Sequence, residues 1–89
     1  MNDAWNAMAD ANRRQILTML KEKDMTAGEI AECFSLSKAT ISHHLSILKE
    51  AGLIVGQKHA QTITYQLNTT VFQDFLKGVA GFFSKEEEK

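Results

Sequence analysis

The chain has 89 residues, of which 44% are hydrophobic and 24% charged, with no proline, as expected for one small folded domain. This composition excludes a disordered tail and a multidomain enzyme, and the net charge of -1 argues against indiscriminate binding to nucleic acid or acidic membranes. A single cysteine, Cys33, cannot close a disulfide within the chain, and no stretch resembles a signal peptide or a membrane-spanning helix. We therefore expect a reduced, cytoplasmic protein, and an oligomer because so short a chain buries a marginal core.

Helices are expected over most of the length, because apolar residues recur at the 3.6-residue spacing of an amphipathic helix. A short first helix is predicted at about 3–9. Asp10 is a suitable N-cap for a second helix that runs to Lys23. The predicted core stripe of this second helix consists of Ile16, Leu17 and Leu20.

Two further capping patterns follow in the chain. Thr26 and Glu29 have the spacing of a capping box, which predicts a short helix over 27–34. Ser37 is predicted to cap a longer helix, over about 38–51. Helix, short turn and capped second helix form the helix-turn-helix pattern, so the longer helix is the candidate recognition helix.

After residue 52 the pattern changes from helical to β-branched and alternating. The segments 53–55 and 62–67 read as strands, and the polar segment 57–61 between them predicts a two-stranded hairpin. A hairpin directly after a helix-turn-helix is a wing, which we place at about 54–67. The predicted fold is therefore mostly helical: a winged helix-turn-helix with about five helices and a two-stranded antiparallel wing, in a single domain over 1–89.

A last helix is predicted to begin at Asn68 or Thr69 and to carry large apolar residues as far as residue 83. Its two neighbouring apolar stripes exceed what one small core can cover. We therefore expect an isologous homodimer in which the segments 3–9 and 69–83 pack against their symmetry mates. The expected dimer interface consists of Trp5, Met8, Phe72, Phe75, Leu76, Val79, Phe82 and Phe83.

The candidate recognition helix has two unlike faces when successive residues are rotated by 100°. Ile41, Leu45 and Leu48 fall on one side and are expected in the core. The opposite side is small, polar and nearly free of acid, so it fits a DNA major groove, which is about 12 Å wide. A solvated helix surface is the alternative reading of such a face. The candidate base-reading residues are Ala39, Ser42, His43 and Ser46.

Charged and polar residues around this helix are candidates for phosphate contacts. The segment 35–66 holds Lys38, Lys49 and Lys58 against Glu50 alone, and it contains every histidine of the chain. At the N-terminus of the helix the dipole and the unpaired amides attract phosphate. The candidates at that end are Ser37, first a cap and second a phosphate contact, Lys38 and Thr40.

His44 and the two arginines of the second helix have a structural interpretation beside a functional one. His44 falls at the edge of the core face and is interpreted as a packed histidine rather than a base reader. Arg13 and Arg14 follow Asp10 by three and four residues, so the simplest interpretation is that they form ion pairs with Asp10 at the surface. Arg14 points farther from the apolar stripe and is the better candidate for a phosphate contact.

Four segments resemble the ArsR-type winged-helix repressors of bacteria. They read MADANRRQIL at 8–17, TAGEIAE at 26–32, LSKATISHHLSILKEAGLI at 36–54 and ITYQL at 63–67. Together they span nearly the whole chain in the expected order. The resemblance implies a symmetric dimer, built on the first and last helices, that represses transcription by binding double-stranded DNA at a palindromic operator.

The chain departs from the metal-sensing members of that family. Where those carry a Cys-x-Cys pair this chain has Thr26 and Gly28, and it has no histidine after His59. Because a transition-metal site needs three or four such ligands, we expect neither a metal nor another cofactor. In this respect the chain resembles the small metal-independent autorepressors of the sporulation-delay type, which implies an inducing protein partner at the membrane.

The wing departs from the family pattern as well. Its tip is Ala60-Gln61, where the family usually has Gly-Arg or Gly-Gln. Without the glycine a turn with positive φ is less favourable, and without the arginine minor-groove contact is weaker. The remaining candidates for DNA contact from the wing are Lys58, His59 and Gln61.

Two other classes of function compete with a repressor. A winged-helix protein-interaction module without DNA binding fits the negative net charge and the altered wing, but the polar recognition face lacks the exposed aromatics of such surfaces. An enzyme is disfavoured because Ser42, His43 and His44 point to different faces of one helix. The expected function is a dimeric, sequence-specific, DNA-binding transcriptional repressor.

Overall fold

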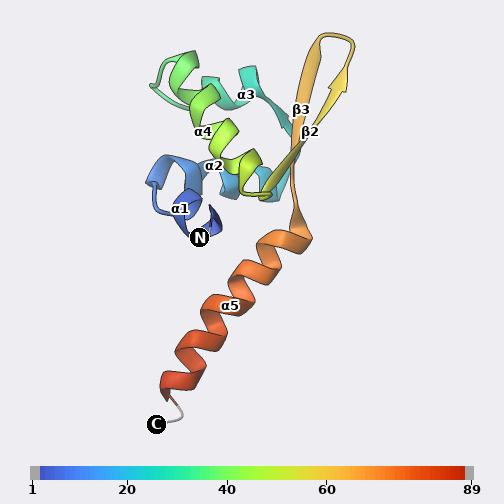
Figure 1. The fold of residues 1–89 in the computed structure, drawn as a ribbon. Helices are drawn as coiled ribbons and strands as arrows, with labels where there is room; N and C mark the ends of the chain where they lie inside the picture. Colours follow the sequence, from blue (N-terminus) through green and yellow to red (C-terminus); the bar gives the residue numbers. More distant parts are fainter. Residues whose placement is uncertain (1–2, 88–89) are drawn as a thin grey trace.

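Five helices and a three-stranded sheet make up the part of the chain that the computed structural model describes, residues 3–87 (Figure 1). The predicted winged helix-turn-helix, mostly helical with a β-hairpin, is confirmed. In chain order the elements are α1 (Asp3–Met8), α2 (Ala11–Glu22), β1 (Met25–Thr26), α3 (Ala27–Glu32), α4 (Lys38–Glu50), β2 (Ile54–His59), β3 (Thr62–Leu67) and α5 (Thr69–Glu87).

Asp10 starts α2 as the sequence predicts. Its carboxylate oxygen Oδ1 accepts hydrogen bonds from the backbone N–H groups of Asn12 at 2.7 Å and Arg13 at 3.2 Å. These bonds satisfy amides that have no acceptor inside the helix. The bond from the Arg13 amide is the largest of the effects that lower the pKa of the Asp10 carboxyl below its ordinary value.

The other two predicted caps are also present. The Thr26 amide donates to the Glu29 carboxylate at 2.9 Å, and the Glu29 amide donates to the Thr26 hydroxyl at 3.1 Å, which completes the capping box of α3. The Ser37 hydroxyl accepts from the Thr40 amide at 3.1 Å and so caps α4. Both helices of the helix-turn-helix therefore begin where the sequence places them.

The core lies where α2, α3 and α4 meet the base of the sheet. Both predicted stripes are buried, with Leu48 and Ile16 fully inaccessible. Burial of each such aliphatic side chain contributes about 1.5–3 kcal/mol to folding. The buried hydrophobic residues are Ala7, Ile16, Leu17, Leu20, Met25, Ile30, Ile41, Leu45, Leu48, Leu53 and Ile54.

The sheet has the order β1-β3-β2 and is antiparallel throughout. The hairpin of β2 and β3 is the predicted wing, paired from Ile54 opposite Leu67 to His59 opposite Thr62. The strand β1 was not predicted, because two residues are too few to show an alternating pattern. It pairs Met25 with Tyr65 and so ties the turn between α2 and α3 to the base of the wing.

The wing turns at Ala60, whose φ is +55°, the one positive value among the described non-glycine residues. The tip thus adopts a positive φ although the sequence, which lacks the family's glycine there, makes such a turn less favourable. An L-residue with a side chain is strained in that conformation, which glycine adopts at little cost. The tip of the wing thus keeps the geometry that glycine favours without having glycine.

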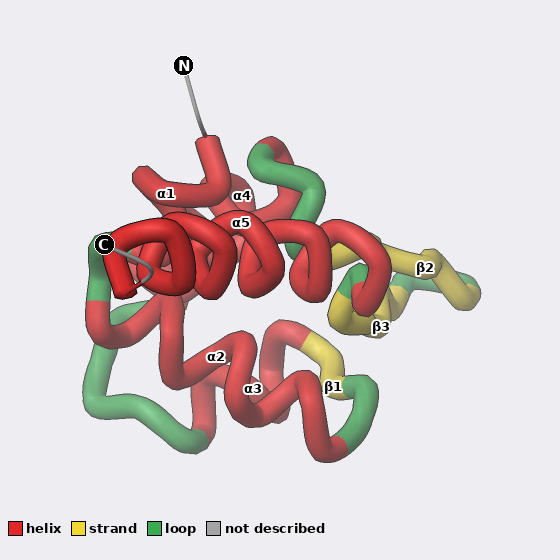
Figure 2. The backbone as a smooth tube through the Cα atoms, turned by 90° about the horizontal axis from the view of Figure 1, so that it is seen from below, coloured by secondary structure: helices red, strands yellow, loops and turns green. Residues whose placement is uncertain are grey.

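The last helix, α5, projects from the base of the wing and runs beneath the bundle on the side of α1 (Figures 1 and 2). It begins after Asn68, whose side chain accepts from the Val71 amide at 3.3 Å. The radius of gyration is 14.3 Å, against about 12 Å for a compact chain of this length. The difference reflects α5, much of which has no cover from its own chain. None of the described helices is both long and apolar enough to span a bilayer.

Candidate nucleic-acid interface

The two faces of α4 are those expected from its sequence. Ile41, Leu45 and Leu48 are buried, which fixes the rotation of the helix against α2 and α3. The opposite face is exposed and carries short side chains with little acid. The exposed residues proposed for DNA contact from this helix are Lys38, Ala39, Thr40, Ser42, His43 and Ser46.

The N-terminal end of α4 offers donors as well as charge. Ser37 caps the helix, and its hydroxyl also lies 2.9 Å from the Thr40 hydroxyl, so the two side chains hold each other. The amides of Lys38 and Ala39, in the first turn, have no acceptor within the helix. Together with the helix dipole and the Lys38 ammonium group, these amides suit a phosphate.

The tip of the wing lies at the same end of the molecule as the N-terminus of α4, away from α5 (Figure 1). The wing residues Lys58, His59 and Gln61 are all exposed. The structure therefore brings the wing candidates and the first turn of α4 to one end. Whether these residues contact DNA stays a prediction.

Arg14 lies in the first turn of α2, next to the end of α1. It is exposed, and its Nη1 donates to the carbonyl oxygen of Met8 at 2.6 Å. The guanidinium thus lies at the C-terminus of α1, where the helix dipole favours a cation. Arg14 therefore has a bond within the chain as well as its proposed role toward phosphate.

The interpretation of Arg13 as a surface partner of Asp10 is wrong. Arg13 is only 9% exposed, and its guanidinium donates to the carbonyl oxygens of Asn6 and Ala7 and contacts His44. The carboxylate of Asp10 is instead engaged by backbone amides. Spacing along one helix could not show this, since the acceptors lie in a different helix that folds back on α2.

The interpretation of His44 as a packed histidine is confirmed. It is 6% exposed, and its Nδ1 lies 3.3 Å from Nη1 of Arg13. Its neighbour His43 is exposed, with the two ring centroids 6.2 Å apart. The two adjacent histidines thus belong to different faces of α4.

The proposed dimer residues are of two kinds, half-buried and exposed. Met8 and Phe72 are half-buried and pack against the core of their own chain. Trp5 is 52% exposed, although its ring makes an edge contact with Phe75 at 5.1 Å. Phe75 and Val79 are half-buried, and the remaining members, Leu76, Phe82 and Phe83, are exposed by 45%, 58% and 55%.

An apolar groove lies beside these aromatic residues, between α1 and α5. It has a volume of about 370 Å³ and is lined by Trp5, Asp74, Phe75, Gly78 and Phe82. A Cβ atom built on Gly78 would meet nothing within 4 Å in its own chain. The side of the groove at Gly78 is therefore not filled by the chain itself.

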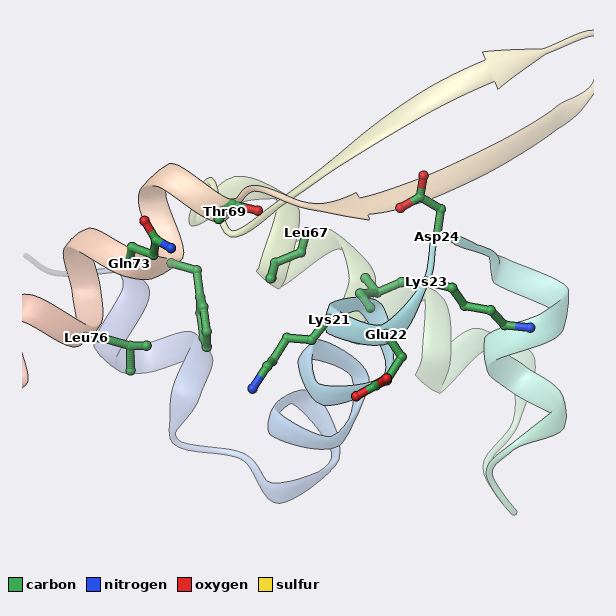
Figure 3. Close-up of a pocket in the computed structure, with 10 residues that line it drawn as sticks. Lys21, Glu22, Lys23, Asp24, Leu67, Thr69, Gln73 and Leu76 are labelled. Carbon is green, nitrogen blue, oxygen red and sulfur yellow. The ribbon is translucent and has the colours of Figure 1, made fainter.

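A separate hollow of about 530 Å³ lies between the end of α2 and the start of α5 (Figure 3). Its floor includes Leu20 and Leu67, and its rim carries charges of both signs, among them Lys21 and Glu22. Lys23, also on the rim, points away from the α5 residues Gln73 and Leu76 (Figure 3). Sequence reasoning did not identify this hollow, because its walls come from segments far apart in the chain.

No cluster of three or more His, Cys, Asp or Glu side chains within residues 3–87 could hold a metal ion. Cys33 is exposed, and its thiol donates to the Glu29 carbonyl oxygen at 3.6 Å. The expectation of a protein without metal or cofactor stays a prediction.

Comparison with known sequences identifies relatives over most of the chain. The family described as bacterial regulatory protein, arsR family, matches residues 10–55. The transcriptional repressor SdpR of Bacillus subtilis (strain 168) is 51% identical over 85 residues, which cover 96% of this chain and 94% of SdpR. The transcriptional activator HlyU of Vibrio cholerae is 41% identical over 64 residues, or 72% of this chain and 59% of HlyU.

Solved structures share the fold. The crystal structure of an ArsR family transcriptional regulator has a TM-score of 0.87 at 24% identity and covers 99% of this chain and 97% of its own. HlyU from Vibrio cholerae N16961 has a TM-score of 0.75 at 32% identity, with 92% of this chain and 89% of HlyU covered. At 24% identity, the first of these two structures establishes the fold alone.

Proposed function

The chain belongs to the arsR family of bacterial regulatory proteins, and we propose that it acts as a homodimer that binds a palindromic operator in double-stranded DNA. In outline the protein is a winged-helix transcriptional repressor of the ArsR type, which follows from the family and from the 51% identity to a repressor over nearly the whole chain. What the proposal adds is the assembly and the residues that contact DNA.

The observation that carries the proposal is the exposed face of α4, whose capped N-terminus lies at the same end of the molecule as the tip of the wing (Figure 1). Small side chains allow a helix to enter a major groove, and hydroxyl and imidazole groups can bond to base edges. In the proposed complex His43 donates to guanine N7 or O6, and Ser42 and Ser46 bond to neighbouring bases. The methyl group of Ala39 suits the methyl group of thymine.

Phosphate contacts would fix the register of the protein on the duplex. We assign them to Lys38, Thr40 and, behind its role as a cap, Ser37 at the start of α4. Lys58, His59 and Gln61 would contact the backbone from the wing, and Arg14 from the first turn of α2. Net charge does not oppose this proposal, because Lys38 and Lys58 lie at the end of the molecule that carries the proposed contacts.

The proposed dimer is isologous and uses α1 and α5. It would cover the aromatic residues that α5 leaves open, above all Phe82 and Phe83. A two-fold axis through this interface places two recognition helices in major grooves about 34–36 Å apart, which requires half-sites roughly one helical turn from each other. The two-fold symmetry is the reason to expect a palindrome.

The remaining expectations complete the proposal. Its relatives are transcriptional regulators, a role without catalysis, and we propose that this chain is likewise not an enzyme. A cytoplasmic location accords with binding to bacterial operators. An inducing protein partner at the membrane stays a prediction from resemblance alone.

Electrophoretic retention of genomic fragments by the purified protein tests the proposal. A repressor retains a small set of fragments that compete with each other for binding and stay bound in an excess of unrelated DNA. A winged-helix protein-interaction module, the alternative, retains none of them while remaining folded and dimeric.

A further inference from the structure

One buried guanidinium joins the helix at the dimer side to the recognition helix. Arg13 uses all three of its nitrogen atoms: Nε donates to Ala7 O at 2.8 Å, Nη2 donates to Asn6 O at 3.1 Å, and Nη1 lies 3.3 Å from His44 Nδ1. The side chain is 9% exposed and His44 is 6% exposed. A single side chain of α2 thus contacts both α1 and α4.

The contact with α1 gives this helix its position. With six residues α1 is too short to be stable alone, so its placement depends on tertiary contacts. The last carbonyl groups of a helix lack donors within it. Here Asn6 O accepts from the Ala9 amide at 3.1 Å as well as from Arg13, and Ala7 O accepts from Arg13. Trp5 precedes Asn6 in α1, and its ring contacts Phe75 of α5. The placement of α1 therefore also places part of the proposed dimer face.

The contact with α4 reaches the recognition helix from its inner side. Arginine stays protonated, so Nη1 is the donor in the contact at 3.3 Å and His44 Nδ1 is the acceptor. His44 follows His43, which is exposed on the base-reading face. Because α4 is one uninterrupted helix of 13 residues, a shift at His44 moves the whole base-reading face.

The partners of the buried arginine are mostly neutral. The Asp10 carboxylate interacts electrostatically with both Arg13 and His44, but its hydrogen bonds go to backbone amides. No carboxylate hydrogen-bonds to the guanidinium among the contacts of the described residues, and its partners are two carbonyl oxygens and a histidine. Burial of a charge costs free energy, and a well-packed apolar residue of similar volume is often as stabilising or more so. What a planar group with several fixed donors adds is a defined geometry between the helices it joins.

We propose that Arg13 and His44 are positioning residues that set the orientation of α4 relative to α1, and with it the spacing of the two base-reading faces in the dimer. This inference rests on the proposed function, since it concerns the DNA-binding dimer. The contact transmits any change at the dimer face to the recognition helix, and by linkage DNA binding acts back on the dimer face to the same degree.

The test compares substitutions of His44 in the full chain, with a DNA fragment that the wild-type protein has selected from a random pool. His44→Asn places an acceptor close to the position of Nδ1, and His44→Leu fills similar space without an acceptor. We expect His44→Leu to lose about tenfold in affinity for the selected fragment, a typical size for coupling between sites. His44→Asn should stay close to wild type.

A second readout separates positioning from folding. The same fragment is lengthened or shortened by one base pair between its half-sites, and binding is measured again. Wild type and His44→Asn should discriminate strongly among the three spacings, and His44→Leu weakly. Dimerisation and helical content, from sedimentation and circular dichroism, should be equal for all three proteins. Should His44→Leu not fold, His44→Gln replaces it, because its acceptor lies one bond farther out.

Each outcome decides the matter. Equal spacing preference in wild type and in His44→Leu, or in the His44→Gln variant that replaces it, overturns the inference, as does an equal loss in His44→Asn. If the wild-type protein selects no fragment, the proposed function itself fails, and that result is distinct from a failure of the Arg13–His44 contact.

Discussion

His43 and His44 are consecutive on α4, with ring planes tilted by 46° and centroids 6.2 Å apart, yet one is exposed and the other is 6% exposed. The rotation of 100° per residue accounts for this difference. It places one imidazole toward solvent, on the proposed base-reading face, and the other against Arg13. The predictions for the two histidines therefore differ in kind.

Removal of the outer imidazole should reduce sequence discrimination. His43→Ala loses a base contact and is expected to reduce discrimination between selected and unrelated DNA by about 1–3 kcal/mol. Competition binding with the two kinds of fragment measures this difference. Because the ring is exposed, thermal stability should change little, and unchanged discrimination would refute the role of His43 as a base reader.

Removal of a phosphate contact should act on all sequences alike. Lys38→Ala deletes an ammonium group at the start of α4 and is expected to weaken binding uniformly, with the slope of log affinity against log salt smaller by about one. Titrations at several salt concentrations provide the slope. Lys21→Ala, on the rim of the hollow between α2 and α5, is a matched control of equal charge and should leave the slope unchanged.

The groove beside Trp5 predicts a contrast between a substitution in α5 that fills the groove and one on another face of α5. A Cβ atom on Gly78 meets nothing within 4 Å in the isolated chain, and Gly78 lines the groove. Gly78→Leu should therefore weaken the dimer, with a cost of about 1–3 kcal/mol for overpacking. Ala80→Leu adds similar bulk two residues along, about 160° around the helix from Gly78, where the side chain is exposed, and should dimerise like wild type. Sedimentation equilibrium distinguishes them, and an intact Gly78→Leu dimer would place the interface elsewhere.

The strained tip of the wing predicts a stabilising substitution. Ala60 has a φ of +55°, so Ala60→Gly relieves strain and should raise stability by up to about 1 kcal/mol after the greater entropy loss of glycine. Denaturant unfolding at one protein concentration measures the change. Gln61→Gly, next to it without positive φ, should lower stability instead. A loss of stability in both variants would contradict this reading of the turn.

Much of the fold could be predicted from local signals in the sequence. Capping residues such as Asp10 and Ser37 mark helix starts because they satisfy backbone amides nearby in the chain. The rotation of α4 follows from the apolar spacing of Ile41, Leu45 and Leu48, so the exposed face could be named in advance.

Features that depend on contacts between distant segments could not be predicted. The strand β1 exists through its pairing with β3, and its two residues carry no pattern of their own. The role of Arg13 depends on the end of α1 folding back over α2, which brings Asn6 O and Ala7 O to the guanidinium. From spacing alone the pairing with Asp10 was the simpler and incorrect interpretation.

The central claim, a dimer that reads a palindrome through α4, is tested most directly by selection of bound fragments from random DNA at two salt concentrations. Sequencing of the retained pool should reveal one inverted repeat, with half-sites about 10–11 base pairs apart, the spacing of one helical turn. Enrichment of such a repeat at both salt concentrations is the predicted result. A folded, dimeric protein that enriches no sequence at either concentration would contradict the account.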